Sequence, residues 1–257
     1  MSSTYIQGGG GGSSLPSTSG ILAGGQLING FSGAEWFDPR KHLIMYDDFG
    51  TGRNQSWLSW DADNNGGTVR GNELGVATNP GFLQLETDSS TSAGPYIYLG
   101  EFGGYGPFIL GGGRMYFHWI IKLSALSDGT DTYSVEVGIG DTQGVQTNSG
   151  VWMSYSHGAN SGNWVANTSD GGTASAGNSS TAATTDWTII GFDINAAASS
   201  VSFYVDGTEI ANSPIATNIP TSDNLAPFAI IKKSAGTSER ELWLDQFYLF
   251  QELTTQR

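Results

Sequence analysis

The segment from Trp187 to Ile210 has the two-residue apolar period of β-strands. Within it, every second residue is large and apolar: Ile190, Phe192 and Ile194, then Val201, Phe203 and Val205. A strand with this pattern buries one of its faces. The dipeptide Asp206-Gly207 follows, and it suits the two positive-φ positions of a tight hairpin turn. The segment therefore predicts two antiparallel strands that lead into a hairpin.

Short stretches of the same kind recur between clusters of Gly, Asn, Asp and Ser, residues that favour turns. No stretch shows convincing helical periodicity. The segment 168–185 is nearly all Gly, Ala, Ser and Thr, and we expect a long exposed loop there. Many short strands with Gly-rich turns predict an all-β fold, a two-sheet antiparallel jelly-roll sandwich. We expect strands at 43–49, 56–60, 68–76, 82–86, 96–99, 114–123, 133–139, 151–156, 163–166, 187–194, 201–205, 228–233 and 242–250.

Residues 1–35 differ from the rest of the chain. Five consecutive glycines run from Gly8 to Gly12, and a Ser-rich stretch follows. Such a sequence has no face to bury, so on its own it is expected to be a flexible tail. Two interpretations stay open: an extended arm held by a neighbouring subunit, or a tail without a partner. We divide the chain into an N-terminal arm at 1–35 and one jelly-roll domain at 36–257.

Composition limits the classes of partner. The chain has 24 acidic and 10 basic residues, a formal net charge of −14. This charge repels nucleic-acid phosphates and anionic membrane surfaces, and it leaves neutral glycans and protein surfaces open. No segment approaches the roughly 20 apolar residues that a membrane span needs, and the N-terminus lacks the features of a secretory signal. The absence of cysteine excludes disulfides and thiolate metal sites.

The segment 61–66, Asp-Ala-Asp-Asn-Asn-Gly, resembles the first half of an acidic calcium loop. It has oxygen-bearing side chains at its first, third and fifth positions and glycine at its sixth. The second half does not follow, because the twelfth position is Asn72 and the next carboxylate comes one place late. We favour an Asx-rich turn between two strands over a Ca²⁺ site, and we expect no other cofactor. The ligands of a Ca²⁺ site would be Asp61, Asp63, Asn65 and Glu73.

Paired carboxylates for sugar hydrolysis are not evident in the sequence. A retaining glycosidase needs two carboxylates about 5 Å apart, and jelly-roll glucanases supply them with a Glu-x-Asp-x-x-Glu strand. Here Glu136 precedes Val-Gly-Ile-Gly-Asp141, so the residue two places on is a glycine. Glu239 and Glu241 have the spacing but flank a predicted turn. The Arg-x-Glu-Leu and Gln-Ile-His motifs of alginate lyases are missing too, so we expect no catalytic residues.

Aromatic residues near loops are the candidates for glycan binding. Flat rings can stack on the C–H faces of sugars, and neighbouring amides can bond the hydroxyls. More than half of the rings at Trp57, Trp60, Trp152, Tyr155 and Trp164 are expected in the core. Trp164 is the best candidate for exposure and Tyr155 the second, with Asn163 and Asn160 as hydrogen-bonding neighbours.

Three segments together resemble the concanavalin-like, laminin-G-like jelly-roll family. They are the opening strand Met-Tyr-Asp-Asp-Phe at 45–49, the Trp-led hairpin at 187–210 with its Tyr-Val-Asp-Gly turn, and the closing strand Leu-Trp-Leu-Asp-Gln-Phe at 242–247. In that family the closing strand returns beside the first. The resemblance covers roughly residues 43–252.

Domains of this kind are widespread as surface-binding modules, often on bacteriophage virion proteins behind a Gly/Ser-rich arm. The resemblance implies a non-enzymatic virion structural protein, such as a capsid decoration, head fibre or tail fibre, assembled in the host cytoplasm. Its arm, 1–35, would bind other virion proteins, and its jelly roll would bind a host surface or a neutral glycan, frequently with calcium. A homo-oligomer such as a trimer is also implied. The alternative is a carbohydrate-active enzyme, a glycosidase or lyase of the same fold, because function resides in sites rather than folds.

Overall fold

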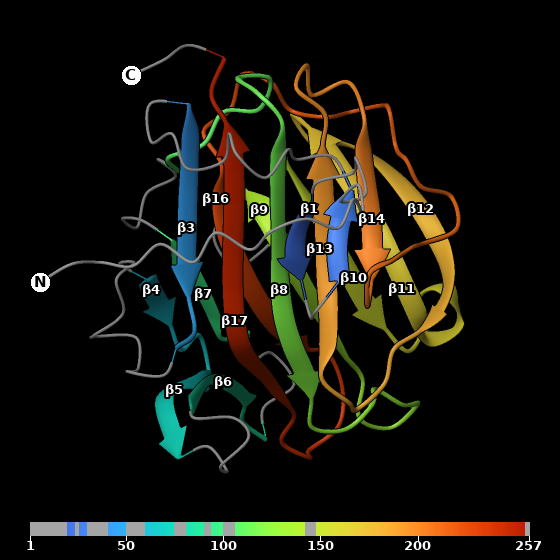
Figure 1. The fold of residues 1–257 in the computed structure, drawn as a ribbon. Coiled ribbons are helices and arrows are strands. Elements are labelled where there is room, and N and C mark those ends of the chain that lie inside the picture. The colour runs from blue at the N-terminus through green and yellow to red at the C-terminus, as the bar shows by residue number, and fades with distance from the viewer. Residues whose placement is uncertain are drawn as a thin grey trace, which may run out of the picture.

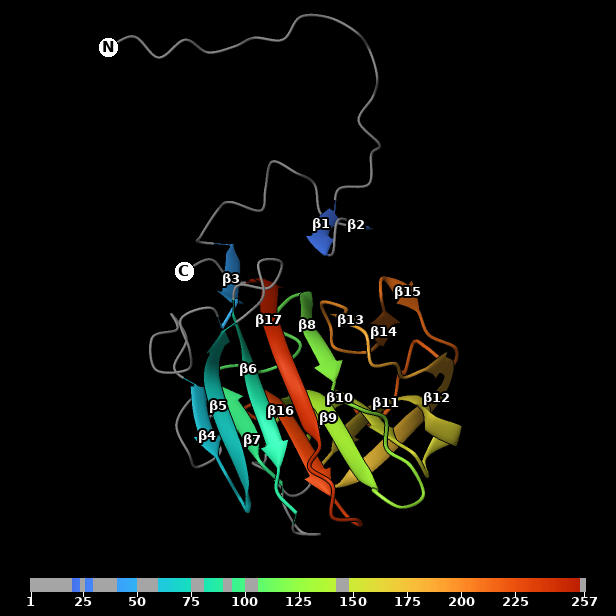
Figure 2. The same cartoon turned by 90° about the horizontal axis from the view of Figure 1, so that it is seen from below.

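The computed structural model describes residues 20–23, 26–29, 41–49, 60–74, 81–89, 94–99, 106–141 and 148–254. In these residues the chain forms β-strands and one short 3-10 turn, η1 (Asn160–Gly162). No helix in the described ranges is long and apolar enough to cross a membrane. Two large antiparallel sheets pack face to face (Figures 1 and 2). The predicted all-β jelly-roll sandwich is confirmed.

The front sheet of Figure 1 has the order β15-β14-β13-β8-β17-β6-β5, and β3 also pairs with β17. The strand bounds agree with the predicted ones to within a few residues. The strands are β3 (His42–Asp47), β5 (Gly67–Leu74), β6 (Gly81–Thr87), β8 (Met115–Leu123), β13 (Thr188–Ile194), β14 (Val201–Val205), β15 (Thr208–Glu209) and β17 (Glu241–Glu252).

The back sheet has the order β12-β11-β10-β9-β16-β7-β4. The strand expected at 56–60 lies outside the described residues except for its last position, which begins β4. The strands are β4 (Trp60–Asp63), β7 (Tyr96–Leu99), β9 (Tyr133–Gly140), β10 (Gly150–Ser156), β11 (Asn163–Asp170), β12 (Thr173–Ala182) and β16 (Ala226–Lys233).

The long loop predicted at 168–185 is wrong, because most of it is strand β12, paired with β11. β12 stands at the edge of the back sheet. Of its residues only the small Gly177 and Ser179 are buried. An edge strand needs backbone hydrogen bonds on one side only, and here it needs no large apolar side chain. The hydrophobic pattern therefore carried no signal for it.

The hairpin predicted from Asp206-Gly207 is confirmed. These two residues have φ angles of 50° and 75° and join β14 to β15. The Asp206 carboxylate also accepts a hydrogen bond from the Ile189 N–H at 2.8 Å. The aspartate thus holds the turn against the start of the neighbouring strand β13.

Strand β17 organises the front sheet. It pairs with β8 along nearly its whole length, with β6 along Glu241–Leu244 and with β3 along Phe247–Glu252. A register irregularity between Leu244 and Gln246 lies where β3 replaces β6 as the neighbour of β17 on that side. The closing strand returns beside the first strand of the domain, as the family resemblance implies.

Large rings fill the space between the two sheets. Trp119 on β8 and Phe247 on β17 meet Trp60 on β4, with ring centroids 4.7 to 5.5 Å apart. The buried carboxylate of Asp47 accepts hydrogen bonds from the Trp60 indole N–H at 2.7 Å and the Phe49 N–H at 2.9 Å. This carboxylate links β3 of the front sheet to β4 of the back sheet.

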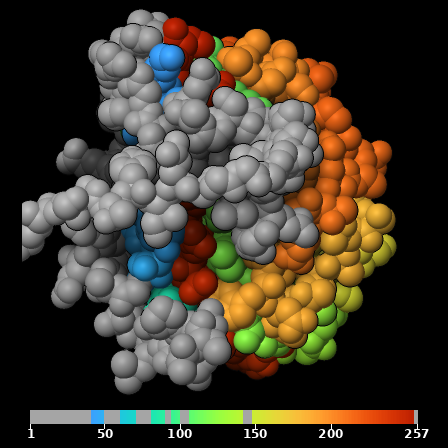
Figure 3. Space-filling model, viewed as in Figure 1, coloured from blue at the N-terminus to red at the C-terminus, as the bar shows by residue number. Residues whose placement is uncertain are grey.

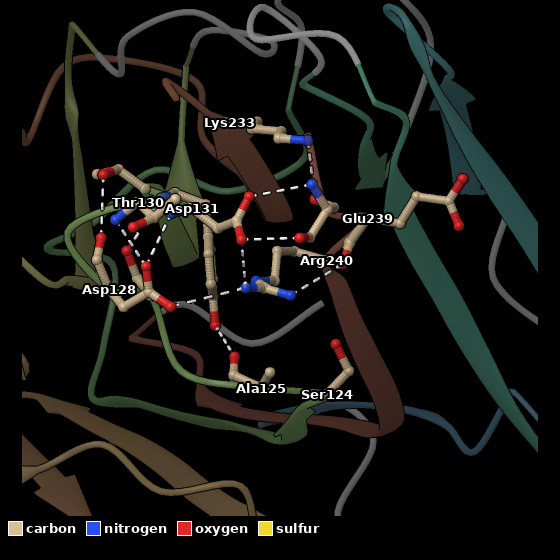
Figure 4. Close-up of polar contacts among 12 residues, drawn as sticks. Ser124, Ala125, Asp128, Thr130, Asp131, Lys233, Glu239 and Arg240 are labelled. Atoms are coloured by element: carbon tan, nitrogen blue, oxygen red, sulfur yellow. Dashed lines mark hydrogen bonds and ion pairs between the residues drawn. The ribbon is translucent and has the colours of Figure 1, made fainter. Parts of the chain in front are cut away.

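A charged cluster ties two loops at one end of the sandwich (Figure 4). Asp131, in the loop after β8, accepts hydrogen bonds from the backbone N–H and hydroxyl of Ser238 at 3.0 and 2.7 Å. Arg240 donates to the same carboxylate at 3.1 Å. The hydrogen bonds from Ser238, followed by the charge of Arg240, lower the pKa of Asp131. The cluster joins the loop after β8 to the loop before β17.

Part of the predicted arm has regular structure. β1 (Gly20–Ala23) pairs with β2 (Gln26–Asn29) as an antiparallel hairpin, a correction to the tail expected there from the Gly/Ser-rich sequence. The hairpin stands in front of the front sheet, and Figure 2 shows it set apart from the sandwich (Figures 1 and 2). The rest of residues 1–35, and the proposed boundary after residue 35, lie outside the described residues.

His118 lies on the outer face of the front sheet, yet it is only 2% exposed. Its ring stacks on Tyr248 at 5.4 Å between centroids, and its Nδ1 is 3.3 Å from the Tyr116 hydroxyl. Burial lowers the pKa of His118 from its ordinary 6.5 to about 4. The imidazole is therefore neutral near neutral pH.

We predict that His118 makes stability depend on pH in a defined window. As the pH falls below 6.5 the unfolded chain takes up a proton first, so stability is lost progressively until about pH 4. The loss is up to about 3 kcal/mol. Urea unfolding of the wild type and of His118→Gln across this range measures it. The variant should lose less stability than the wild type, whereas His157→Gln, at an exposed position, should follow the wild type. Equal pH dependence in all three proteins would contradict the prediction.

Candidate functional site

The predicted exposure of Trp164 and Tyr155 is wrong. Trp164 is 1% exposed and Tyr155 is 2% exposed. Their rings contact each other at 5.8 Å inside the sandwich, and the Tyr155 hydroxyl accepts a hydrogen bond from the Ser127 N–H at 2.8 Å. Both side chains have the strand parity that faces the core, so neither ring offers a face to a sugar.

Of the predicted polar neighbours, Asn160 begins η1 and Asn163 begins β11. The Asn160 side-chain amide donates to the carbonyl oxygens of Trp164 at 3.1 Å and Ser179 at 2.7 Å. This amide therefore holds η1 against β11 and β12. Asn163 is half-buried and its backbone pairs with Ala182. Asn160 therefore stabilises the local structure, and both asparagines lie beside the buried Trp164.

The predicted calcium ligands lie in and next to the β4–β5 turn. The Asp63 carboxylate accepts a hydrogen bond from the Asn65 N–H at 2.9 Å, which is the geometry of an Asx turn. Asp61 accepts one from the Ala62 N–H at 2.9 Å. Glu73 lies in β5, but its side chain is outside the described part of the structure. Within that part, no group of three or more His, Cys, Asp and Glu residues could hold a metal ion.

The outer face of the back sheet brings other residues together in two rows that run across its strands. Directly paired residues of neighbouring antiparallel strands share a face, so the register defines each row. The first row is Asp61, Tyr98, Phe228, Gly138, Trp152 and Asn167. The second row is Asp63, Tyr96, Ile230, Glu136, Ser154 and Val165. We call these two rows the back-sheet face.

Aromatic residues dominate one half of the back-sheet face. Tyr96, Tyr98, Phe228 and Ile230 form a buried apolar cluster, and the half-buried Trp152 packs against it. The Tyr96 hydroxyl is 3.3 Å from Asp63, and burial followed by this carboxylate raises the pKa of Tyr96 to about 12. The buried hydroxyl of Tyr98 has no hydrogen-bond partner among the described residues. The four residues of the cluster are at most 5% exposed, so the half-buried Trp152 is the ring that this face can offer to a ligand.

Polar groups occupy the other half of the back-sheet face. The Asn167 side-chain amide donates to the Ser154 hydroxyl at 3.0 Å. The Lys232 ammonium lies 3.3 Å from the Glu136 carboxylate, and both side chains are partly exposed. Amide, hydroxyl, carboxylate and ammonium groups beside a ring are the set that can bond sugar hydroxyls.

Gly138 explains why Glu136 has no carboxylate partner two places along β9. A Cβ atom at this position would be 2.2 Å from the Val151 carbonyl oxygen and 2.6 Å from Trp152 Cβ. The backbone of β10 therefore leaves no room for a side chain. The third carboxylate of the pattern, Asp141, accepts hydrogen bonds from the N–H groups of Asn148 and Ser149 at 3.1 and 2.8 Å. It holds the ends of the β9–β10 connection.

The sequence comparison assigns the chain to a family. Residues 79–245 match the family described as SO2946-like, C-terminal domain. The chain belongs to this family. No curated protein sequence matches it.

Solved structures share the fold of this SO2946-like domain. The carbohydrate recognition domain of Emp47p has a TM-score of 0.56 and 11% identity, covering 83% of this chain and 98% of that one. The β-glucanase of Bacillus licheniformis has a TM-score of 0.52 and 16% identity, covering 83% and 98%. The metal-free Emp46p carbohydrate recognition domain has a TM-score of 0.52 and 7% identity, covering 79% and 97%. The predicted concanavalin-like fold is thereby confirmed.

Strand parity could have found Trp152 in the sequence. Val151, Met153 and Tyr155 are large and apolar at alternate positions, whereas the intervening residues are Trp152, Ser154 and Ser156. The first set faces the core and the second faces outward. Nearness to a polar loop is therefore a weaker signal of an exposed ring than strand parity.

We predict that Gly138→Ala destabilises the fold by about 1–3 kcal/mol, because the added methyl group overlaps the backbone of β10. Chemical unfolding of the purified variant measures this. Gly158→Ala is the matched control, since a Cβ there meets no atom within 4 Å. An unfolding free energy equal to that of the control would contradict the proposed close approach of β9 and β10.

Proposed function

We propose that this protein is a non-enzymatic structural protein of a bacteriophage virion, a capsid decoration, head fibre or tail fibre, whose jelly roll binds neutral glycans. The observation that carries the binding role is the back-sheet face, where the half-buried Trp152 adjoins an aromatic cluster and a set of paired polar side chains. A net charge of −14 favours neutral over anionic glycans.

The absence of catalysis is part of the proposal. A retaining or inverting hydrolase needs a carboxylate acid and a second carboxylate at a set separation. On β9, Glu136 is paired with Lys232, and the position two residues on is a glycine without room for a side chain. These contacts favour sugar binding over the alternative, a glycosidase or lyase of the same fold.

The virion role is supported by the arm and by the composition. The Gly/Ser-rich segment 1–35 suits a tether that other virion proteins hold. The domain has no cysteine, so its stability does not depend on the redox state of the host cytoplasm or of the outside. We further propose that the assembled form is a homo-oligomer such as a trimer, which places several copies of the binding face on one particle and raises avidity.

We predict that Trp152→Ala weakens glycan binding at least about tenfold, because it removes the ring beside the polar groups of the face. A neutral-glycan array followed by calorimetry on the best ligand measures this. Ile109→Ala, which shortens another exposed apolar side chain (49% exposed), is the control. Release of reducing ends by the wild type, abolished in Glu136→Gln, would instead establish the enzyme alternative.

We predict that a chain beginning at Glu35 folds but is lost from particles, because the jelly roll would be free of its tether. Cryo-electron microscopy of particles assembled with full-length or shortened chain measures the occupancy. The shortened chain should keep the thermal unfolding midpoint of the full chain. Normal occupancy of the shortened chain would contradict the anchoring role of residues 1–35.

A further inference from the structure

Another row of side chains crosses the outer face of the front sheet, on the side of the sandwich opposite the back-sheet face. Arg70 pairs with Gln84, Gln84 with Trp243, and Trp243 with Lys122. Trp187 follows in the same row, because its neighbour Thr188 pairs with Ile121. We call these five residues the front-sheet row. Neighbouring strands are about 4.8 Å apart, so the row spans about 19 Å.

The two indoles of the front-sheet row form one cluster with Phe82 of β6. Phe82 stacks on Trp243 with centroids 4.9 Å apart and an interplanar angle of 20°. Trp187 is 6.3 Å from Trp243 and 6.2 Å from Phe82. All three rings are half-buried and lie outside the core of the sandwich. Figure 3 shows this face, where atoms of β8 (green) and β17 (red) reach the surface.

Lys122 lies over the two indoles of the cluster. Its ammonium nitrogen is 4.8 Å from the Trp243 ring centroid and 5.9 Å from that of Trp187, within the range of a cation–π contact. Among the described residues Lys122 has no carboxylate within ion-pair distance, whereas Arg70, Arg114, Lys232 and Arg240 each have one. Its ammonium group carries three N–H donors beside these rings.

Fixed hydrogen-bonding groups border the rings. The Trp243 indole N–H donates to Glu241 at 2.7 Å, which sets the orientation of that ring. Gln84 donates to Glu86 at 3.0 Å, and Arg70 donates to the same carboxylate at 3.1 Å. Positively and negatively charged groups thus lie beside rings that are not part of the core.

We propose that the front-sheet row is a second carbohydrate-binding surface, which takes a neutral glycan chain. The rings would stack on the C–H faces of the sugars, and Lys122 and Glu241 would bond their hydroxyls. Each hydroxyl of a neutral glycan both donates and accepts hydrogen bonds, and this face offers a donor in Lys122 and an acceptor in Glu241. An anionic lipid surface is disfavoured because Glu86 and Glu241 lie beside the rings in a chain of net charge −14. The row and the back-sheet face lie on different sheets, so either surface can bind a glycan independently of the other.

The indole N–H signals of the full-length protein test the proposal, because the chain has eight tryptophans. Single Trp→Phe variants assign the signals in proton–nitrogen correlation spectra. The spectra are then recorded with increasing cellohexaose, laminarihexaose, mannohexaose and chitohexaose. At least one of these glycans should shift the signals of Trp187 and Trp243 saturably and leave the buried Trp119 unchanged. The proposal is overturned if no glycan moves them, or if only Trp152 responds.

Variants then separate the two surfaces. Trp187→Ala and Lys122→Gln should each weaken binding of the responding glycan about tenfold as measured at Trp243, and Ile109→Ala should leave it unchanged. Loss of binding in Trp152→Ala alone would overturn the front-sheet row and leave the proposed function standing. Loss in both Trp187→Ala and Lys122→Gln but not in Trp152→Ala would overturn the back-sheet face as the binding site and leave the front-sheet row standing.

Discussion

The packing of two sheets through alternate side chains is the constraint on which the rest of the structure depends. The inner strands of both sheets give one parity to the shared core, where Trp60, Trp119 and Phe247 meet. The other parity is left to two outer faces, which are free to carry polar groups and isolated rings. The proposed glycan binding therefore depends on the residues at the outward parity, of which Trp152 and Trp243 are two half-buried rings.

The two layers are also joined at one edge by a buried carboxylate. Asp47 is 3% exposed and satisfies both oxygens, one with the Trp60 indole and one with the Phe49 N–H. Removing either partner would leave a buried polar group unpaired, a situation that proteins largely avoid. The two adjacent aspartates of the opening strand thus differ in environment, since Asp47 is buried and Asp48 is exposed.

Alternation in the sequence predicted nearly all of the described strands, because burying one face of a sheet demands a two-residue period. It missed the β1–β2 hairpin and also β12, which has no large apolar side chain on either face. Site prediction was weaker. Trp164 and Tyr155 have polar neighbours in the sequence, but their parity points inward and both are buried. The rows that cross the sheets could not be predicted at all, because they depend on the register between strands that lie far apart in the sequence.

Strand β17 also has a kinetic consequence. Its partners in β3 and β6 lie more than 150 residues earlier in the chain, as in the pairs Glu252–His42 and Glu241–Glu86. Bringing such distant segments together costs chain entropy before any contact compensates for it. Proteins dominated by non-local pairings fold in milliseconds to seconds rather than microseconds. Until β17 inserts, the facing edges of β8, β6 and β3 stay unpaired, and during that interval they are open to pairing with another chain.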